Sequence, residues 1–147
     1  MDYDALRAGM AAAVPFNNHL GLEVTALGPG TATVRLPDDE RLTNHVGTQH
    51  AAGLFAAAEA ASGGAFVAGF ADRLAEIRPL AASAEISYTK LAKGPIDARA
   101  ELPGTKGLLE TLDAQGKVSF PVEVTLTDAD GHTVATATVQ WHVRLSA

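Results

Sequence analysis

The sequence contains no cysteine, and this absence excludes several kinds of chemistry. Without thiols the chain forms no disulfide, carries no thiolate nucleophile and builds no zinc site on cysteine. Aromatic residues make up only 5% of the chain, and lysine and arginine gather in no cluster. Because the formal net charge is −6, neither nucleic acid nor a membrane surface is expected as a partner.

A secretory signal is also missing from the start of the sequence. The segment Met1-Asp2-Tyr3-Asp4 is acidic, and no apolar stretch of the kind found in signal peptides follows it. We therefore expect a cytoplasmic protein. The 147 residues contain no linker, repeat or low-complexity tract, so the sequence predicts a single domain over residues 1–147.

Small and apolar residues fill the segment 51–71, in which Glu59 is the only charged residue before Asp72. No face of this segment is polar at a period of 3.6 residues, which is typical of a helix buried on all sides. A membrane span is the less favoured alternative, because an unpaired acid in mid-bilayer is costly. We expect a central core helix that has Thr48 as its N-cap and ends near Gly63-Gly64, followed by a short helical piece over 68–75.

The lone acid in this helix needs an explanation of its own. A carboxylate in apolar surroundings costs several kcal/mol unless it is paired, hydrogen-bonded or protonated. Glu59 is therefore either a residue at a helix edge that contacts solvent or a site carboxylate with a shifted pKa. We favour the second interpretation, because a core helix does not require a charge.

Alternation of apolar and polar residues predicts the strands. A helix over 2–13, stopped by Pro15 and Asn17-Asn18, precedes them. The predicted strands are 21–27, 31–36, 83–91, 96–102, 117–127 and 133–145. We expect them to pair in sequence as three hairpins. This order predicts an α+β fold in which an antiparallel sheet of five or six strands wraps around one long buried helix.

Helix geometry constrains how His50 and Glu59 can cooperate. Nine residues of helix place them about 13 Å apart on opposite sides, so they cannot meet within one chain. A two-fold dimer would bring the helix start of one subunit near Glu59 of the other. Free N–H groups at that start would polarise a carbonyl, and the carboxylate would activate water or attack directly. This arrangement suits acyl transfer by a homo-oligomer.

Other catalytic classes fit less well. Ser62 lacks the glycine-flanked setting of a nucleophilic serine, since Ala60-Ala61 precedes it. His45 and His50 are five residues apart and lack the spacing of a helical zinc pair, so we expect no metal. His19, His132 and His142 are interpreted as surface or edge-strand residues.

The segment from Asn44 to Gly53, Asn-His-Val-Gly-Thr-Gln-His-Ala-Ala-Gly, together with Glu59, resembles the N-x-x-G-x-x-H-G-G signature and following acid of hot-dog fold thioesterases of the phenylacetyl-CoA thioesterase-like group. The strand 86–92 is similar to the Tyr-x-x-Pro-Ala strand of that family, and Gly-Thr-Gln-His-Ala is similar to the motif of an uncharacterised thioesterase branch. The resemblance covers the chain in element order. It implies a hot-dog fold and a dimeric or tetrameric enzyme that hydrolyses a small acyl-CoA or aryl-CoA thioester with no further cofactor.

The resemblance also implies roles for single residues. Glu59 would be general base or nucleophile, the Ala51 N–H would stabilise the oxyanion, and Asn44 would orient the water or the thioester. His50 would form a hydrogen bond near the thioester carbonyl, and Ser83 would support the water. The implied substrate-binding residues are His45, Gly47, Ala52, Phe55, Lys90 and Lys93, with the two lysines near the phosphates of CoA. Phe66 and Phe70 are further candidates to close the acyl pocket.

The sequence departs from this family in two places and leaves two alternatives open. Ala51-Ala52 replaces Gly-Gly and narrows the approach to the amide, and Leu91 replaces the strand proline. Hot-dog hydroxyacyl thioester dehydratases use a histidine and an acid with the separation of His45 and Glu59, but their Phe-Pro-Gly segment reads Val46-Gly47-Thr48 in this chain. A dimer that binds acyl-CoA without turnover is the other alternative.

Overall fold

The computed structural model describes residues 1–146. The elements, in chain order, are α1 (Tyr3–Ala13), α2 (Pro15–His19), β1 (Glu23–Gly28), β2 (Thr31–Leu36), η1 (Glu40–Leu42), α3 (Ala51–Gly69), η2 (Ala71–Glu76), β3 (Ile77–Tyr88), β4 (Ile96–Glu101), α4 (Thr105–Gln115), β5 (Lys117–Thr127) and β6 (Thr133–Leu145). The two η elements are short 3₁₀ helices.

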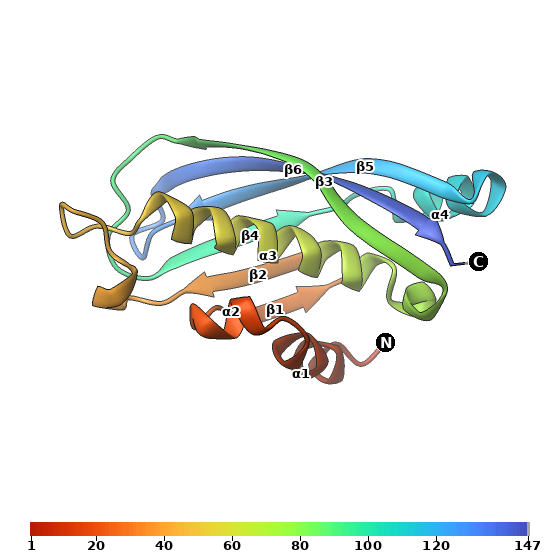
Figure 1. Cartoon of the computed structure of the whole chain (residues 1–147), viewed down its shortest axis with the longest axis horizontal. Helices are drawn as coiled ribbons and strands as arrows, with labels where there is room; N and C mark the ends of the chain where they lie inside the picture. The colour runs from red at the N-terminus through yellow and green to blue at the C-terminus, as the bar shows by residue number, and fades with distance from the viewer. Residues whose placement is uncertain (147) are drawn as a thin grey trace.

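The strands form one antiparallel sheet in the order β1-β2-β4-β5-β6-β3. Figure 1 shows this sheet curving around α3, with α1 and α2 beside the same helix and α4 at the far end. One helix enclosed by an antiparallel sheet is the α+β architecture predicted from the sequence. The structure confirms the hot-dog fold that the resemblance implied.

Small side chains let α3 approach the sheet closely. Ala57, Ala61 and Ala65 are fully buried against the strands, and a Cβ added to Gly64 would lie 2.8 Å from the Ala32 Cβ on β2. By length and composition alone α3 would suffice to cross a membrane, yet 61% of its apolar window is buried inside the fold. The alanine and glycine content therefore reflects close packing of a core helix.

Both ends of α3 differ from the prediction. His50, not Thr48, is the N-cap: its Nδ1 accepts a hydrogen bond from the Ala52 N–H at 2.9 Å. Gly63-Gly64 does not end the helix, which continues to Gly69. Each glycine inside a helix lowers the stability of the helix by about 1 kcal/mol relative to alanine, but close packing on β2 and Met10 offsets this loss. The short helical piece expected over 68–75 is instead the last turn of α3 and the 3₁₀ helix η2.

The predicted middle hairpin is also wrong. β3 starts at Ile77 and, within residues 1–146, pairs only with β6, while β4 lies between β2 and β5. Alternation identifies a strand but not its partner, so neighbours in sequence were wrongly paired. The sequence also failed to indicate α4, whose only buried residue is Leu112, and α2, which Pro15 begins.

Candidate active site

The loop before α3 is held together by the side chain of Asn44. Its Oδ1 accepts the N–H groups of Val46 and Thr48 at 3.0 and 3.1 Å. Its Nδ2 donates to the Thr48 Oγ1 at 2.9 Å and to the Gln49 carbonyl at 3.4 Å. Both ends of this amide are therefore used inside the loop, which turns at Gly47 with a positive φ of 80°.

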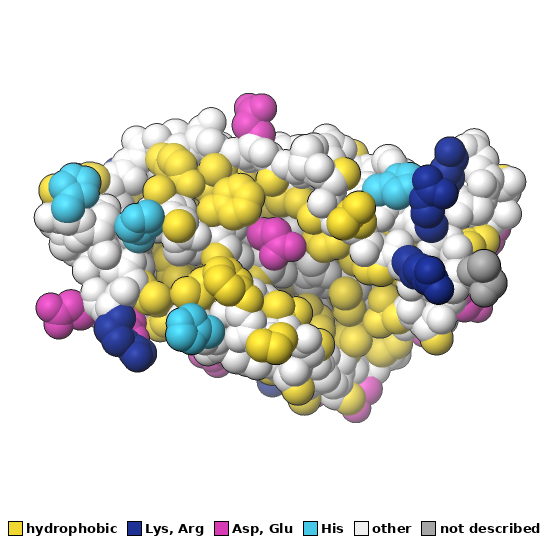
Figure 2. Space-filling model, viewed as in Figure 1, with side chains coloured by type: hydrophobic (Ala, Val, Ile, Leu, Met, Phe, Trp, Pro, Cys, Tyr) yellow, Lys and Arg dark blue, Asp and Glu magenta, His cyan; other side chains and the backbone are white. Residues whose placement is uncertain are grey.

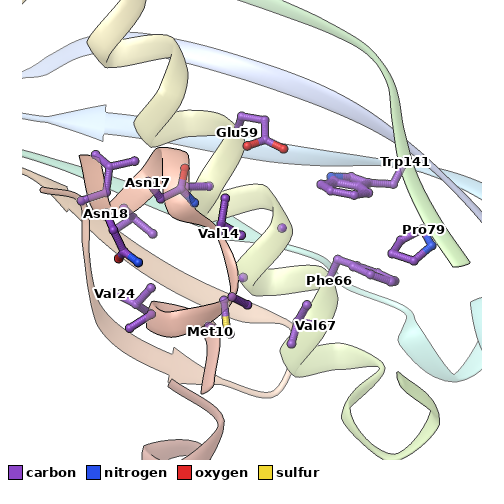
Figure 3. A pocket seen from close by; sticks show the side chains of 17 residues that line it. Met10, Val14, Asn17, Asn18, Val24, Glu59, Phe66, Val67, Pro79 and Trp141 are labelled. Carbon is purple, nitrogen blue, oxygen red and sulfur yellow. The ribbon is translucent and has the colours of Figure 1, made fainter. Parts of the chain in front are cut away.

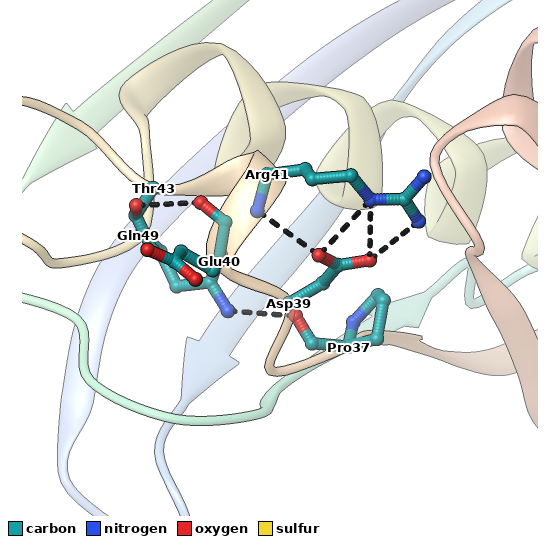
Figure 4. Close-up of polar contacts among 6 residues, drawn as sticks. All are labelled: Pro37, Asp39, Glu40, Arg41, Thr43 and Gln49. Carbon is teal, nitrogen blue, oxygen red and sulfur yellow. Dashed lines mark hydrogen bonds and ion pairs between the residues drawn. The ribbon is translucent and has the colours of Figure 1, made fainter.

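Gln49 fixes the same loop to its surroundings. Its side chain is buried, and Nε2 donates to the carbonyls of Pro37 at 2.9 Å and Gly94 at 2.8 Å. Its backbone N–H donates to the Ala92 carbonyl at 2.8 Å. Figure 4 shows the contact with Pro37 beside η1, where Asp39 accepts hydrogen bonds from Arg41. The glutamine of the motif thus has a structural role, since it joins three loops.

The start of α3 presents a free donor. His50 Nδ1 accepts from Ala52, so the neutral imidazole carries its proton on Nε2 and can donate there. The Ala51 N–H contacts no acceptor within residues 1–146. The Tyr88 hydroxyl donates to the Ala51 carbonyl at 3.0 Å and ties the helix start to β3. Burial raises the pKa of Tyr88, which keeps this hydroxyl protonated.

Glu59 lies half-buried in the middle of α3. Burial raises the pKa of its carboxyl group above the usual value near 4.5. Its carboxylate forms no hydrogen bond or ion pair with the residues of the described chain 1–146. The Glu59 backbone carbonyl accepts a hydrogen bond from the buried Ser62 Oγ at 2.7 Å. The Ser62 Oγ in turn accepts a hydrogen bond from Trp141 Nε1 at 3.0 Å. The backbone at this point is fixed while the carboxylate has no partner.

A partly open cavity of about 240 Å³ lies beside Glu59, between the N-terminal helices and α3. Figure 3 shows the apolar side chains of Met10, Val14, Val67 and Phe66 around it, with Trp141 near the Glu59 carboxylate. An engineered apolar cavity of about 150 Å³ holds benzene. This cavity can therefore receive an aromatic ring or an aliphatic group of similar bulk.

An open groove runs from Glu59 along α3 to the helix start. It is lined by Phe16, Asn17, His50, Ala51, Ala52, Phe55, Ala56, Glu59 and Tyr88. Figure 2 shows this face of the molecule as a hollowed apolar area with one acidic side chain in its middle. Phe16 and Phe55 are exposed here, and large exposed apolar areas mark sites of binding or assembly.

The structure brings some predicted residues together and keeps others apart. Glu59, His50, Ala51, Ala52 and Phe55 line the one groove. The expectation that His50 and Glu59 face opposite sides fails, because His50 is an N-cap with extended backbone and lies outside the helical wheel. Phe66 lines the cavity beside Glu59, whereas Phe70 is fully buried in the core and does not line it.

Three other predicted residues lie away from Glu59 within the chain. His45 and Gly47 are exposed in the loop, and Ser83 lies on the exposed strand β3 next to a register shift. Because His45 lines neither cavity, the chain does not show the His45–Glu59 pair that a dehydratase would need.

Lys90 and Lys93 line a separate depression together with Asp128, Asp130 and His132. The N–H of His132 is the main cause that lowers the pKa of Asp128, and the charge of Lys90 adds to it. These carboxylates offset the charge that the lysines would present to a phosphate. Asp128, Asp130 and His132 are close enough to share a metal ion, but one Asp128 oxygen already accepts two backbone N–H groups of this turn.

Three residues of this region escaped the sequence-based prediction: Asn17, Ser62 and Tyr88. Asn17 was interpreted only as a helix stop, yet its side chain lines both the cavity and the groove. A useful signal was the presence of two adjacent amides, Asn17-Asn18, directly after Phe16. Ser62 and Tyr88 carried no such signal, because their contacts join segments far apart in the sequence.

Comparison with solved structures agrees with this fold. A Pseudomonas aeruginosa protein, PA5026, described as of unknown function and a probable thioesterase, is 26% identical, with 99% of this chain and 97% of that chain covered and a TM-score of 0.88. A thioesterase family protein from Silicibacter pomeroyi is 21% identical, covers 98% and 99% of the two chains and has a TM-score of 0.78. The Escherichia coli PaaI protein of the phenylacetic acid degradation operon is 18% identical over 97% and 94%, with a TM-score of 0.76.

A search of curated proteins finds no match. A family model described as a domain of unknown function, DUF4442, matches residues 3–143. This match covers nearly all of the sequence, and the hot-dog fold agrees with that of the thioesterase-like neighbours. The chain therefore belongs to the DUF4442 family.

Proposed function

We propose that the protein is a thioester hydrolase that releases a small acyl or aryl group from coenzyme A. The observation that carries this proposal is an unpaired, half-buried carboxylate beside an apolar cavity of ligand size. A carboxyl group whose pKa is raised toward neutrality is a better general base than one in water. The description of PA5026 as a probable thioesterase supports the same reaction, and the operon of PaaI supports an aryl acid.

The proposed reaction uses Glu59 and the start of α3. Glu59 takes a proton from water as the water oxygen bonds to the thioester carbon, and the carbonyl electrons move to its oxygen. The Ala51 N–H and the His50 Nε2–H stabilise that oxyanion. The C–S bond then breaks, and the proton held by Glu59 passes to the departing sulfur. No cofactor enters these steps, because coenzyme A belongs to the substrate.

Distance along the helix supports a site shared between two copies of the chain. Ala51 and Glu59 are separated by eight residues, about 12 Å along the axis, so one thioester cannot contact both in one helix. β3 forms one edge of the sheet and is exposed from Arg78 to Glu85. A long unpaired edge strand favours pairing with another strand. A two-fold dimer through β3 would place a second helix start near Glu59, and Ser83, Lys90 and Lys93 remain candidate contacts from that copy.

The first experiment measures thiol release from a panel of aryl, short-chain and long-chain acyl-CoA thioesters. We expect Glu59→Gln to lower kcat by roughly 10² to 10⁴-fold, because it removes the general base. Glu110→Gln is the matched control, since Glu110 is exposed on α4, remote from the cavity lining. Retention of wild-type turnover by a folded Glu59→Gln variant would contradict the proposal, and binding of acyl-CoA without thiol release would favour the non-catalytic alternative.

Subunit complementation tests the shared site. Ala51→Pro removes the free N–H, and proline is tolerated at the first position of a helix, where His50 before it is already extended. Each variant alone is expected to be inactive. Mixed dimers of Glu59→Gln and Ala51→Pro regain one intact site only if the two groups come from different subunits. Failure of the mixture to recover activity, with mixed dimers demonstrated, would place both groups in one subunit.

A further inference from the structure

Two side chains form the junction between the cavity beside Glu59 and the groove along α3. Asn17 on α2 and Glu59 on α3 are the residues common to both linings within the described chain. The cavity on one side is lined mainly by aliphatic and aromatic side chains. The groove on the other side leads to His50, Ala51 and Tyr88 at the helix start. A ligand that extends from one space into the other must pass this pair.

The Asn17 side chain has no partner among residues 1–146, although its backbone is fully used. Its N–H donates to the Val14 carbonyl at 3.1 Å, and its carbonyl accepts from Leu22 at 3.0 Å. The side chain is half-buried and projects into the cavity opposite Glu59 (Figure 3). Polar groups withdrawn from water without partners cost free energy. An unpaired amide facing an unpaired carboxylate indicates a position for a polar group of a ligand.

The side chain of Asn44, in contrast, is fully hydrogen-bonded within the chain. Its Oδ1 and Nδ2 are both taken by the loop that contains Val46, Thr48 and Gln49. Using this amide to orient water would break bonds that hold the loop. Asn17 therefore has the free amide that a hydrolytic site beside Glu59 requires.

We propose that Asn17 is a catalytic residue that holds the attacking water beside Glu59, and that the acyl and pantetheine parts of the substrate lie on either side of this pair. The inference rests on the proposed thioester hydrolysis. The Asn17 Oδ1 accepts one hydrogen of the water while Glu59 removes the other, which aims the oxygen at the thioester carbon. The acyl group lies in the cavity, and the pantetheine arm follows the groove toward the helix start.

The size of the cavity predicts the class of acyl group. A cavity of about 240 Å³ exceeds the volume of about 150 Å³ that holds benzene, so it fits an aryl ring with a short linker or a short branched chain. Trp141 stacks on Phe66 with ring centroids 5.4 Å apart, and both line the cavity. Long straight acyl chains exceed this space. Aryl-CoA and short branched acyl-CoA thioesters are therefore the expected substrates.

Asn17→Ala and Gln115→Ala form a matched pair for the test. Gln115 is also an amide, but it is exposed at the end of α4 and lines neither the cavity nor the groove. We expect Asn17→Ala to lower kcat on the order of 10- to 100-fold with little change in KM, because a mispositioned reactant costs rate. Gln115→Ala should stay within about twofold of wild type, because it positions no reactant. Equal kcat values for the two folded variants would overturn the role of Asn17 and leave the proposed hydrolysis standing.

A second readout does not depend on turnover. Asn17→Asp places a new carboxylate next to Glu59, and a neighbouring like charge raises the pKa of a carboxyl group. The other titratable groups of the two linings are His50 and Tyr88, and no lysine or arginine among residues 1–146 lines either space. Carbon-13 NMR titration of Glu59 should show a higher midpoint in Asn17→Asp than in wild type or in Gln115→Glu, whose new carboxylate lies on α4 outside both linings.

The two readouts separate the two proposals. An unchanged Glu59 midpoint in Asn17→Asp would overturn the Asn17–Glu59 pair whatever the enzyme hydrolyses. Absence of thiol release by the wild-type protein from every thioester, with the midpoint raised as expected, would overturn the proposed hydrolysis while supporting the pair. A raised midpoint together with a selective loss of kcat in Asn17→Ala supports both.

Discussion

The loop before α3 and the junction beside Glu59 are both rich in polar residues, but they treat these residues differently. In the loop, Asn44 uses both ends of its amide. The Gln49 Nε2 joins Pro37 and Gly94, while the buried Gln49 Oε1 has no hydrogen-bond partner within residues 1–146. At the junction, the side chains of Asn17 and Glu59 contact no polar partner within the described residues 1–146. A motif residue that is fully hydrogen-bonded in its own protomer stabilises the fold, while an unpaired one is available to a ligand.

The largest effect on stability is expected from the loop. Asn44→Ala removes four hydrogen bonds and leaves backbone groups unpaired, so we expect the free energy of unfolding to fall by about 2–3 kcal/mol. Asn17→Ala removes none and should change it by no more than about 0.5 kcal/mol. Urea unfolding of both variants measures the difference. Similar losses in the two variants would remove the distinction between loop and junction.

Ser62 lies near the junction, but its side chain is hydrogen-bonded as Asn44 is in the loop. Its Oγ donates to the Glu59 carbonyl and accepts from Trp141 Nε1, so it belongs with the satisfied groups although it is near the site. Ser62→Ala leaves the indole N–H buried and unpaired, at an expected cost of about 1–2 kcal/mol. In a double-mutant cycle with Trp141→Phe, measured by urea unfolding, the two losses should be less than additive. Strict additivity would show that the bond contributes nothing.

A smaller change in stability should accompany a change in specificity at Gly63. A Cβ there would lie 3.5 Å from the Trp141 Cζ2, an ordinary contact, so alanine fits and narrows the cavity. Gly63→Ala should stabilise the helix by about 0.5–1 kcal/mol and lower kcat/KM for aryl substrates relative to acetyl-CoA. Gly107→Ala on α4 has open space around it and is the control, with a similar gain in stability and unchanged specificity. Unaltered specificity in Gly63→Ala would argue that acyl groups bind elsewhere.

The smallest expected effect on stability is that of pH on Glu59. Burial raises the pKa of this carboxyl group in the folded state, so folding favours the protonated form. The stabilising contribution is present below the unfolded pKa and is lost as pH rises through the folded pKa. Glu59→Gln should therefore unfold at higher urea concentration than wild type at pH 7, and the difference should vanish below the usual value near 4.5. A difference that grew toward acid pH would reverse this sign and contradict a desolvated carboxyl group.

Much of the fold followed from local pattern. The segment 51–71 lacks a polar face and contains a single charge, and it forms the core helix α3. Alternation located all six strands, and on β2, β4, β5 and β6 it matches one buried side of the strand. Alternation did not reveal that β3 joins β6 at the edge, because pairing depends on the path of the chain between strands. α4 was missed because its exposed surface gives a weak apolar period.

The candidate site, like the fold, was predicted from the sequence only in part. The sequence by itself determined that one acid would lie in apolar surroundings at Glu59, because no other residue of the core helix carries charge and burial of a helix requires apolar neighbours. Only the tertiary structure decided which amide would face it. Asn44 and Asn17 are equivalent as residue types, but the loop closes around Asn44, whereas packing of α2 beside α3 leaves Asn17 unpaired at the cavity. Hydrogen-bond partners are a property of the folded chain, and local sequence does not specify them.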